Sequence, residues 1–277
     1  MRRLGRLAGL GSLACTLAAC GGGVPLLYPA RTLPFGDVRA SSGVSGNFAV
    51  GSLATAEAAA RPISQNPSPP VGTAATTFTQ GALVSAAVAP GFAPYVAARV
   101  GIGARFEAGV AYTGRAGHID VRRSFDWNDV SLSVGLGVTV PIYGDSYTSS
   151  TSAIDLTYVH GYGADIPILI GWQSAARIYM VWAGVRAGID HVDVSSLSTE
   201  PGTFPADESI SGNRYYGGGG VGFAAGFRHI HAALELDAAY QSVSGTYASV
   251  VGSTTTDTNA SVHGFSLTPG AAMWFTF

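Results

Sequence analysis

Arginine and carboxylate side chains recur on one parity of the alternating segments of this 277-residue chain, opposite the apolar residues. The set comprises Arg39, Arg99, Arg105, Arg122, Arg186 and Arg228 together with Glu107, Asp120, Asp165, Asp190, Glu235 and Asp237. Guanidinium and carboxylate groups form planar bidentate pairs, so a balanced set should interlock. We therefore expect a salt-bridged, largely filled interior. The alternative that remains open is a narrow polar pore or a solute-binding cavity.

Histidines offer few further candidates for chemistry. His191 and Asp193 share a parity, with Asp190 beside them, and a His–Asp pair can act as a general base toward water. The second acidic pair that such a site needs is missing at matching positions. No His, Cys and Asp cluster has metal-ligand spacing. The sequence therefore predicts no catalytic residue, no metal site and no cofactor.

The elements that carry these charges alternate with a period of two, which is the pattern of an extended strand with two unlike faces. The pattern is cleanest over 129–142, where Val130, Leu132, Val134, Leu136, Val138, Val140 and Ile142 oppose Ser131, Ser133, Gly135, Gly137 and Thr139. Small residues on the polar parity suit a crowded lumen better than a solvated surface.

Counting back from the C-terminus gives nine such segments: 261–277, 230–245, 214–228, 176–192, 155–172, 129–142, 117–126, 105–114 and 92–103. An even number is required if both termini lie on the periplasmic side. Residues 38–50 supply the tenth strand, and residues 51–91 then form a long outer loop in which Leu53 to Arg61 could be helical. A rival interpretation makes 78–89 the first strand instead.

Composition and connection lengths indicate a membrane barrel. Only 12% of residues are charged, there is no Lys, and 47% are hydrophobic, whereas about a quarter of residues are charged in a soluble domain. The region after the leader has no run of eighteen apolar residues for a helical span. Short turns alternate with longer polar segments at 143–154, 193–213 and 246–260. We expect an all-β, antiparallel transmembrane β-barrel of ten strands, with short periplasmic turns and long outer loops.

The C-terminal segment carries a resemblance to a known class of proteins. Phe277, Phe275 and Met273 fall on one parity and the chain stops on the aromatic ring. This ending resembles the C-terminal sorting signal of bacterial outer-membrane β-barrels. The resemblance implies that barrel assembly machinery reads these residues and that outer-membrane lipid surrounds the folded protein.

The N-terminus predicts export and lipidation. Arg2, Arg3 and Arg6 precede a short apolar stretch, which is the pattern of a secretory signal peptide over residues 1–19. The tetrad that ends at Cys20 resembles a bacterial lipobox, which implies acylation of Cys20. Residues 20–37, with several prolines and little periodicity, are expected to form a lipidated tether, and residues 38–277 the barrel.

The resemblance to small bacterial outer-membrane barrels covers residues 38–277 and places the protein in the bacterial outer membrane. We favour a structural or surface-interaction role, with an extracellular ligand bound through the outer loops, and a narrow channel for small solutes is the alternative. Outer-membrane protease and lipid hydrolase activities rank last, because His229-Ile230-His231 does not reproduce the Ser–His motif of the lipid deacylases. The net charge of −2 and the lack of a basic stripe exclude nucleic acid as a partner.

Overall fold

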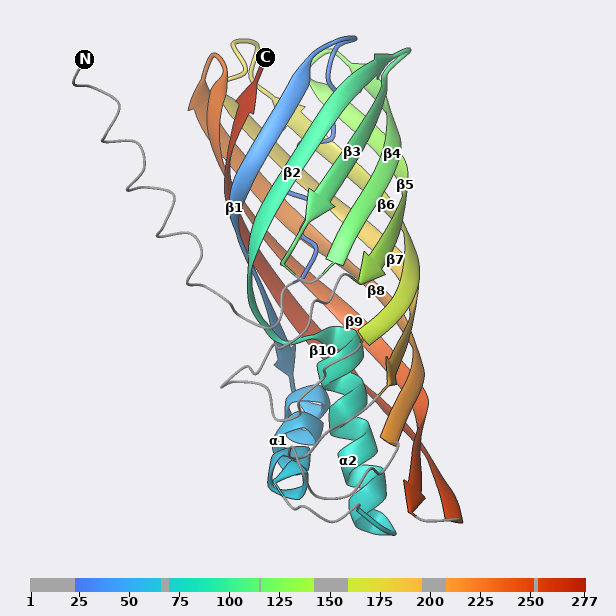
Figure 1. Ribbon diagram of the computed structural model, residues 1–277. Coiled ribbons are helices and arrows are strands. Elements are labelled where there is room, and N and C mark those ends of the chain that lie inside the picture. The colour runs from blue at the N-terminus through green and yellow to red at the C-terminus, as the bar shows by residue number, and fades with distance from the viewer. Residues whose placement is uncertain (1–22, 66–69, 115, 142–158, 196–207, 252–253) are drawn as a thin grey trace, which may run out of the picture.

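Ten antiparallel strands close into a barrel in the computed structural model (Figure 1), which describes all residues except 1–22, 66–69, 115, 142–158, 196–207 and 252–253. The strands are β1 (Val38–Val50), β2 (Gly91–Gly103), β3 (Phe106–Tyr112), β4 (Ala116–Trp127), β5 (Val130–Pro141), β6 (Val159–Gln173), β7 (Tyr179–Ser195), β8 (Glu208–Phe227), β9 (Ile230–Val251) and β10 (Thr254–Thr276). The predicted fold class and strand number are confirmed.

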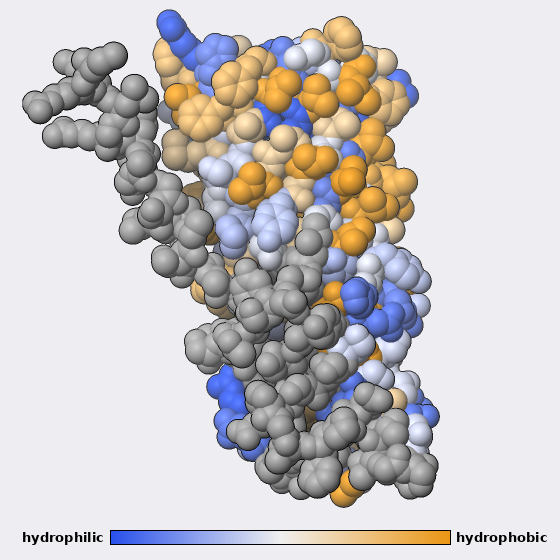
Figure 2. All heavy atoms as spheres, in the orientation of Figure 1, coloured by the Kyte–Doolittle hydropathy of each residue, from blue (hydrophilic) through white to orange (hydrophobic). Residues whose placement is uncertain are grey.

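The outer face of the barrel is an apolar belt. On β5, the side chains of Val134, Leu136 and Val138 are exposed, while Ser131 and Ser133 point inward and are buried. Figure 2 shows hydrophobic residues predominating over the upper part of the barrel and hydrophilic residues lower down. A closed sheet leaves no unpaired edge inside a bilayer, and this belt is the architecture of bacterial outer-membrane proteins. The protein is therefore an outer-membrane barrel.

The seam of the barrel joins β1 to β10, with Ala40 opposite Phe275 and Ser42 opposite Met273. Residues 38–50 are thus the first strand, and the rival strand at 78–89 is wrong. That segment instead contains the end of helix α2 (Thr73–Leu83) and a π-helical turn, η1 (Val84–Val88). Helix α1 (Ser52–Ser64) covers the stretch expected to be helical. None of the described helices is long and apolar enough to span a membrane.

Parts of two predicted outer loops are strand. β8 begins at Glu208, inside the segment 193–213, and β9 and β10 extend through most of 246–260. The inward side chains of these extensions are apolar where they meet the helices, as Ile210 and Tyr247 show. The outward side chains need no apolar character, because these parts of the strands lie beyond the belt. The third predicted loop, 143–154, lies outside the described residues.

The described residues of the segment 52–88, which we call the lid, cover the loop-side end of the lumen (Figure 1). Phe78 of α2 packs edge-on against Tyr247 of β9, with the ring centroids 5.3 Å apart. Asn47 and Arg214, which extend from the barrel wall, donate hydrogen bonds to the carbonyl groups of Val88 and Ala87. Apolar packing and these polar contacts together hold the lid inside the extended strands.

Residues 23–37, which we call the plug, run through the lumen from the lid toward the short-turn end of the barrel. Leu26, Leu27, Tyr28 and Ala30 are each at most 6% exposed, so this segment is not the free tether that its prolines suggested. At its C-terminal end, Gly36 donates a backbone hydrogen bond to the carbonyl of Gly101. The chain then turns into β1 at the short-turn end of the barrel.

Candidate functional site

A buried ion-pair network occupies the barrel wall over β2, β3 and β4. The Arg99 guanidinium bonds to the carboxylates of Glu107 and Asp120, which lie on the two following strands. Arg122 shares Glu107, with 2.9 Å between its Nη2 and Glu107 Oε1. All four side chains are at most 4% exposed. These residues are adjacent because inward positions of neighbouring antiparallel strands lie opposite one another, as Glu107 and Arg122 do.

The network continues around the lumen through a histidine. His118 Nε2 lies 3.0 Å from Asp165 Oδ2, and its Nδ1 lies 3.6 Å from Asp120 Oδ2. Asp165 also pairs with Arg186 on β7. A separate pair, Asp190 with Arg214, lies nearer the lid. The linked pairs from Arg99 to Arg186 form one continuous band of both charges rather than a ring of one charge.

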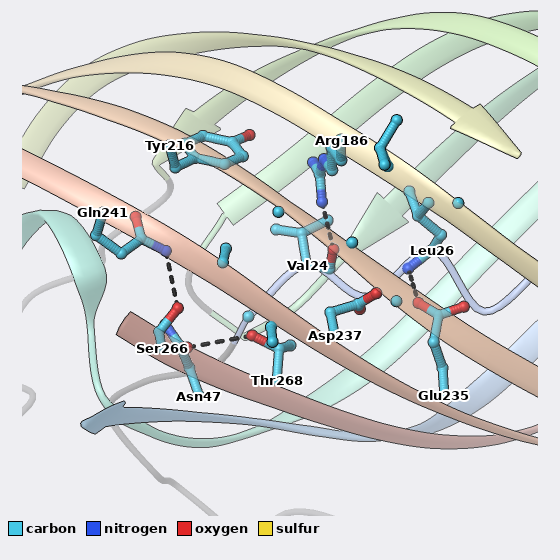
Figure 3. Close-up of a pocket in the computed structure, with 18 of the residues that line it drawn as sticks. Val24, Leu26, Asn47, Arg186, Tyr216, Glu235, Asp237, Gln241, Ser266 and Thr268 are labelled. Atoms are coloured by element: carbon cyan, nitrogen blue, oxygen red, sulfur yellow. Dashed lines mark hydrogen bonds between the residues drawn. The ribbon is translucent and has the colours of Figure 1, made fainter. Parts of the chain in front are cut away.

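The same wall charges also hold the backbone of the plug. The Glu235 carboxylate accepts a hydrogen bond from the Leu26 amide at 2.5 Å (Figure 3). It also accepts hydrogen bonds from the Leu27 amide at 2.8 Å and from Trp182 Nε1 at 2.7 Å. Arg186 donates to the carbonyl of Val24 at 2.6 Å. The plug lacks regular secondary structure, so these side chains satisfy backbone groups that would otherwise be buried without partners.

The other wall of the barrel holds the second half of the plug. Glu107 Oε2 accepts a hydrogen bond from the Leu33 amide at 2.8 Å, and Arg122 donates to the carbonyl of Pro29 at 2.6 Å. The Tyr28 ring lies against two cations, 3.9 Å from Arg99 Cζ and 4.2 Å from Arg122 Cζ. Cation–π contacts strengthen where they are desolvated. The ion-pair network thus binds this half of the plug directly.

Little empty space remains between plug and lid. A cavity of about 90 Å³ lies above Val24, with Arg186, Tyr216, Asp237 and Gln241 among its lining residues (Figure 3). A second cavity of about 90 Å³ lies beneath the lid. Both cavities are therefore small for a chain of this size. Pockets for drug-sized ligands run to roughly 300–1,000 Å³.

Neighbouring side chains occupy the space that a Cβ atom would take at two glycines of β8. A Cβ on Gly220 would lie 1.6 Å from Asp237 Oδ1, and one on Gly222 would lie 2.0 Å from Trp182 Cε2. Glycine within a strand permits such a close approach of a neighbouring side chain. Large side chains therefore cross the lumen over the glycine-rich strand.

The structure places most of the predicted lumen residues inside the barrel: Arg39, Arg99, Arg122, Arg186, Glu107, Asp120, Asp165, Asp190, Glu235 and Asp237. The predicted lumen position of Arg105 and Arg228 is wrong, because both are exposed in short turns where the alternation of the strand has ended. Sequence reasoning missed Arg214 and His118. Arg214 could have been found, since it continues the inward parity of Gly218, Gly220 and Gly222.

The suggested His–Asp constellation is divided between two faces. His191 and Asp193 lie on the outer face of β7, with 2.9 Å between His191 Nε2 and Asp193 Oδ2, and His191 Nδ1 contacts Asn213. Asp190 faces inward to Arg214. Within the described part of the chain, no group of three His, Cys, Asp or Glu side chains is placed to hold a metal ion.

Comparisons with known proteins give no family assignment: no family model matches, and neither does any curated protein. Among solved structures, the chain is similar to a major outer membrane protein from Thermus thermophilus, at 10% identity and a TM-score of 0.37, covering 87% of this chain and 99% of that one. An outer membrane channel from Pseudomonas putida is 8% identical, with a TM-score of 0.33 and coverage of 90% and 98%. An anion-selective porin from Comamonas acidovorans is 11% identical, with a TM-score of 0.21 and coverage of 88% and 75%.

Proposed function

We propose that this chain is an outer-membrane barrel that stays closed at rest and that acts as a structural or surface-interaction protein rather than as an enzyme. The observation that carries the proposal is the plug, which side chains from opposite walls hold by its own backbone. With the lid over the other end, the two cavities left between plug and lid measure only about 90 Å³ each. Because the plug and the lid both block the lumen, the described part of the barrel has no continuous path for solutes.

The surface available for interaction is the loop-side end. β8, β9 and β10 continue beyond the apolar belt, and the lid packs against their inner face. Among the described residues, this end is a folded platform of strand and helix. A rigid platform loses less conformational entropy when it binds a partner, which is why we assign the contact with an extracellular ligand to this end.

Conductance of the purified, intact protein in a planar lipid bilayer tests the proposal. We expect no steady current from inserted protein, with insertion verified by heat-modifiable migration of the same sample. Large steady conductance from the unmodified protein would reject the closed barrel and would make the channel the better function.

The second candidate is a narrow channel for small solutes, with the plug as its gate. It is favoured by one observation: the plug lacks regular secondary structure, and side-chain bonds to its backbone hold much of it in place. Such a segment could leave the lumen without unfolding a strand. Uptake of small solutes into vesicles only after a stimulus that releases the plug would favour this candidate.

Phe277→Ser is expected to reduce insertion much more than folded stability. The Phe277 ring is 74% exposed, so folding gains little from it, and the backbone bonds between Phe277 and Val38 remain in the variant. The yield of heat-modifiable barrel in outer-membrane fractions measures insertion. Phe227→Ser is the matched control, because that ring is 65% exposed at the same end of the barrel but is not terminal. Equal yields of the two variants would argue against the C-terminal signal.

Cys20→Ser is expected to abolish labelling by radioactive fatty acid while the protein stays in the outer membrane. One acyl chain binds a membrane marginally, whereas a closed barrel with an apolar belt is effectively irreversible. Cys20 itself lies outside the described residues. Cys15→Ser should keep its label and serves as the control. Recovery of the Cys20 variant as a soluble periplasmic protein would contradict the barrel.

A further inference from the structure

A third cavity, of about 280 Å³, lies at the short-turn end of the barrel between the plug and the turns. We call it the arginine pocket, because five of its lining residues are Arg31, Arg39, Arg105, Arg177 and Arg228. Asp126 is the one carboxylate among its described lining residues, and it lies 3.6 Å from both Arg31 and Arg105. The pocket is strongly positive and belongs neither to the ion-pair network nor to the lid.

Buried donors in the arginine pocket lack acceptors. Arg39 is only 5% exposed, yet its Nε and Nη1 have no hydrogen-bond partner among the described residues. Its guanidinium lies over the ring of Trp274, 4.9 Å from the centroid, and Trp274 Nε1 is likewise buried without a partner. The nearby Glu107 carboxylate already bonds to Arg99 and Arg122. Unsatisfied buried donors are rare and costly, so this set indicates a missing acceptor.

The turn arginines adopt a backbone conformation that favours glycine or asparagine. Arg105, Arg177 and Arg228 have φ values of 62°, 55° and 56°, in the left-handed region. Each lies in a short turn that enters or follows a hairpin strand, where Gly or Asn would be without strain. Strained backbone persists at positions where the side chain has a role. Here the three side chains have in common that they line one cavity.

We propose that the arginine pocket binds a phosphate group carried by a small solute on the periplasmic side. The planar guanidinium fork matches a phosphate bidentately, and several arginines around one cavity are the usual arrangement for this anion. Arg39 and Trp274 supply buried donors, and the exposed turn arginines Arg105, Arg177 and Arg228 also line the pocket. The cavity lies inside the ring of turns, which favours a free solute over a phospholipid headgroup with the same chemistry.

Isothermal titration of the detergent-solubilised full chain with inorganic phosphate at low salt tests the site. The wild type should bind phosphate saturably, and Arg39→Gln should weaken binding roughly tenfold, as loss of a charged hydrogen bond does. Arg177→Gly should weaken binding as well, yet fold at least as stably, because glycine relieves the left-handed backbone. Absence of saturable binding to the wild type would overturn the proposal.

Arg123→Gln is the matched control, since Arg123 lies on the outer face of β4 near the same end, against the rings of Phe106 and Phe125. It should bind phosphate as the wild type does. Wild-type affinity for phosphate in both Arg39→Gln and Arg177→Gly would place the anion elsewhere and overturn the site. Reconstitution in phosphatidylglycerol or phosphatidylcholine nanodiscs separates the two sources. Undiminished binding of free phosphate in both supports a solute, and loss of binding in phosphatidylglycerol alone supports a headgroup in the same pocket.

Discussion

Deletion of residues 23–36 is expected to convert a silent barrel into a conducting one. The deletion removes the chain that Glu235, Glu107 and Arg122 hold within the lumen. Water would then fill the vacated space and solvate the freed carboxylates and guanidinium groups, so the wall itself should survive. Discrete current steps in planar bilayers, together with heat-modifiable migration of the variant, would record this outcome.

Tyr28→Phe is the control for the deletion. The Tyr28 hydroxyl has no hydrogen-bond partner in the described part of the chain, so phenylalanine keeps the ring between Arg99 and Arg122 at little cost. This variant should stay silent. If the deletion variant also stays silent although its barrel is intact, the wall side chains alone close the lumen, and the plug is not the barrier.

Arg99→Ala is expected to lower the free energy of unfolding by roughly 3–5 kcal/mol, the range for breaking a buried ion pair by removing one partner. The change leaves Asp120 without its guanidinium and takes one of two cations from Glu107, and both carboxylates are at most 4% exposed. It also removes one of the cations that flank Tyr28. Urea unfolding in detergent micelles measures the loss.

Arg123→Ala provides the comparison for Arg99→Ala, because this arginine lies on the outer face and contacts only aromatic rings in the described contacts. Its loss should cost about 1 kcal/mol or less. A similar small loss in Arg99→Ala would show that water reaches the ion-pair network and that the lumen is wetter than its packing indicates.

The barrel could be predicted from the sequence because each strand in the membrane has two unlike faces. Alternation such as that of 129–142 fixes which parity meets lipid, and with it the inward direction of Arg99 and Glu107. Parity fails where a strand ends, which is why Arg105 and Arg228 were placed inside. It also fails beyond the belt, where lipid no longer imposes apolar residues on the outer face, so β9 and β10 were predicted too short.

The plug and the lid could not be derived from periodicity. The prolines of residues 23–37 exclude regular structure and suggested a free tether, but Leu26, Leu27 and Tyr28 are apolar or aromatic and suit a buried segment. The sequence of the segment 78–89, most of which belongs to the lid, fits both a strand and a buried helix, since a short apolar run does not distinguish the two. The lumen decides the conformation of both segments, because the plug binds its charged side chains and the lid fills its loop-side end. These contacts join residues far apart in the sequence, so periodicity along the chain does not reveal them.

The contacts of the plug bear on the order in which the barrel forms. Glu235 lies on β9 and Glu107 on β3, so the plug is bound on both sides of the β1–β10 seam. The Leu26–Glu235 bond spans 209 residues, a long loop whose closure carries a high entropic cost. Because the plug precedes β1 directly, its bonds to β9 and β3 bring strands from the two sides of the seam close together. The segment that blocks the finished lumen would then also speed closure of the sheet, which can still close without it.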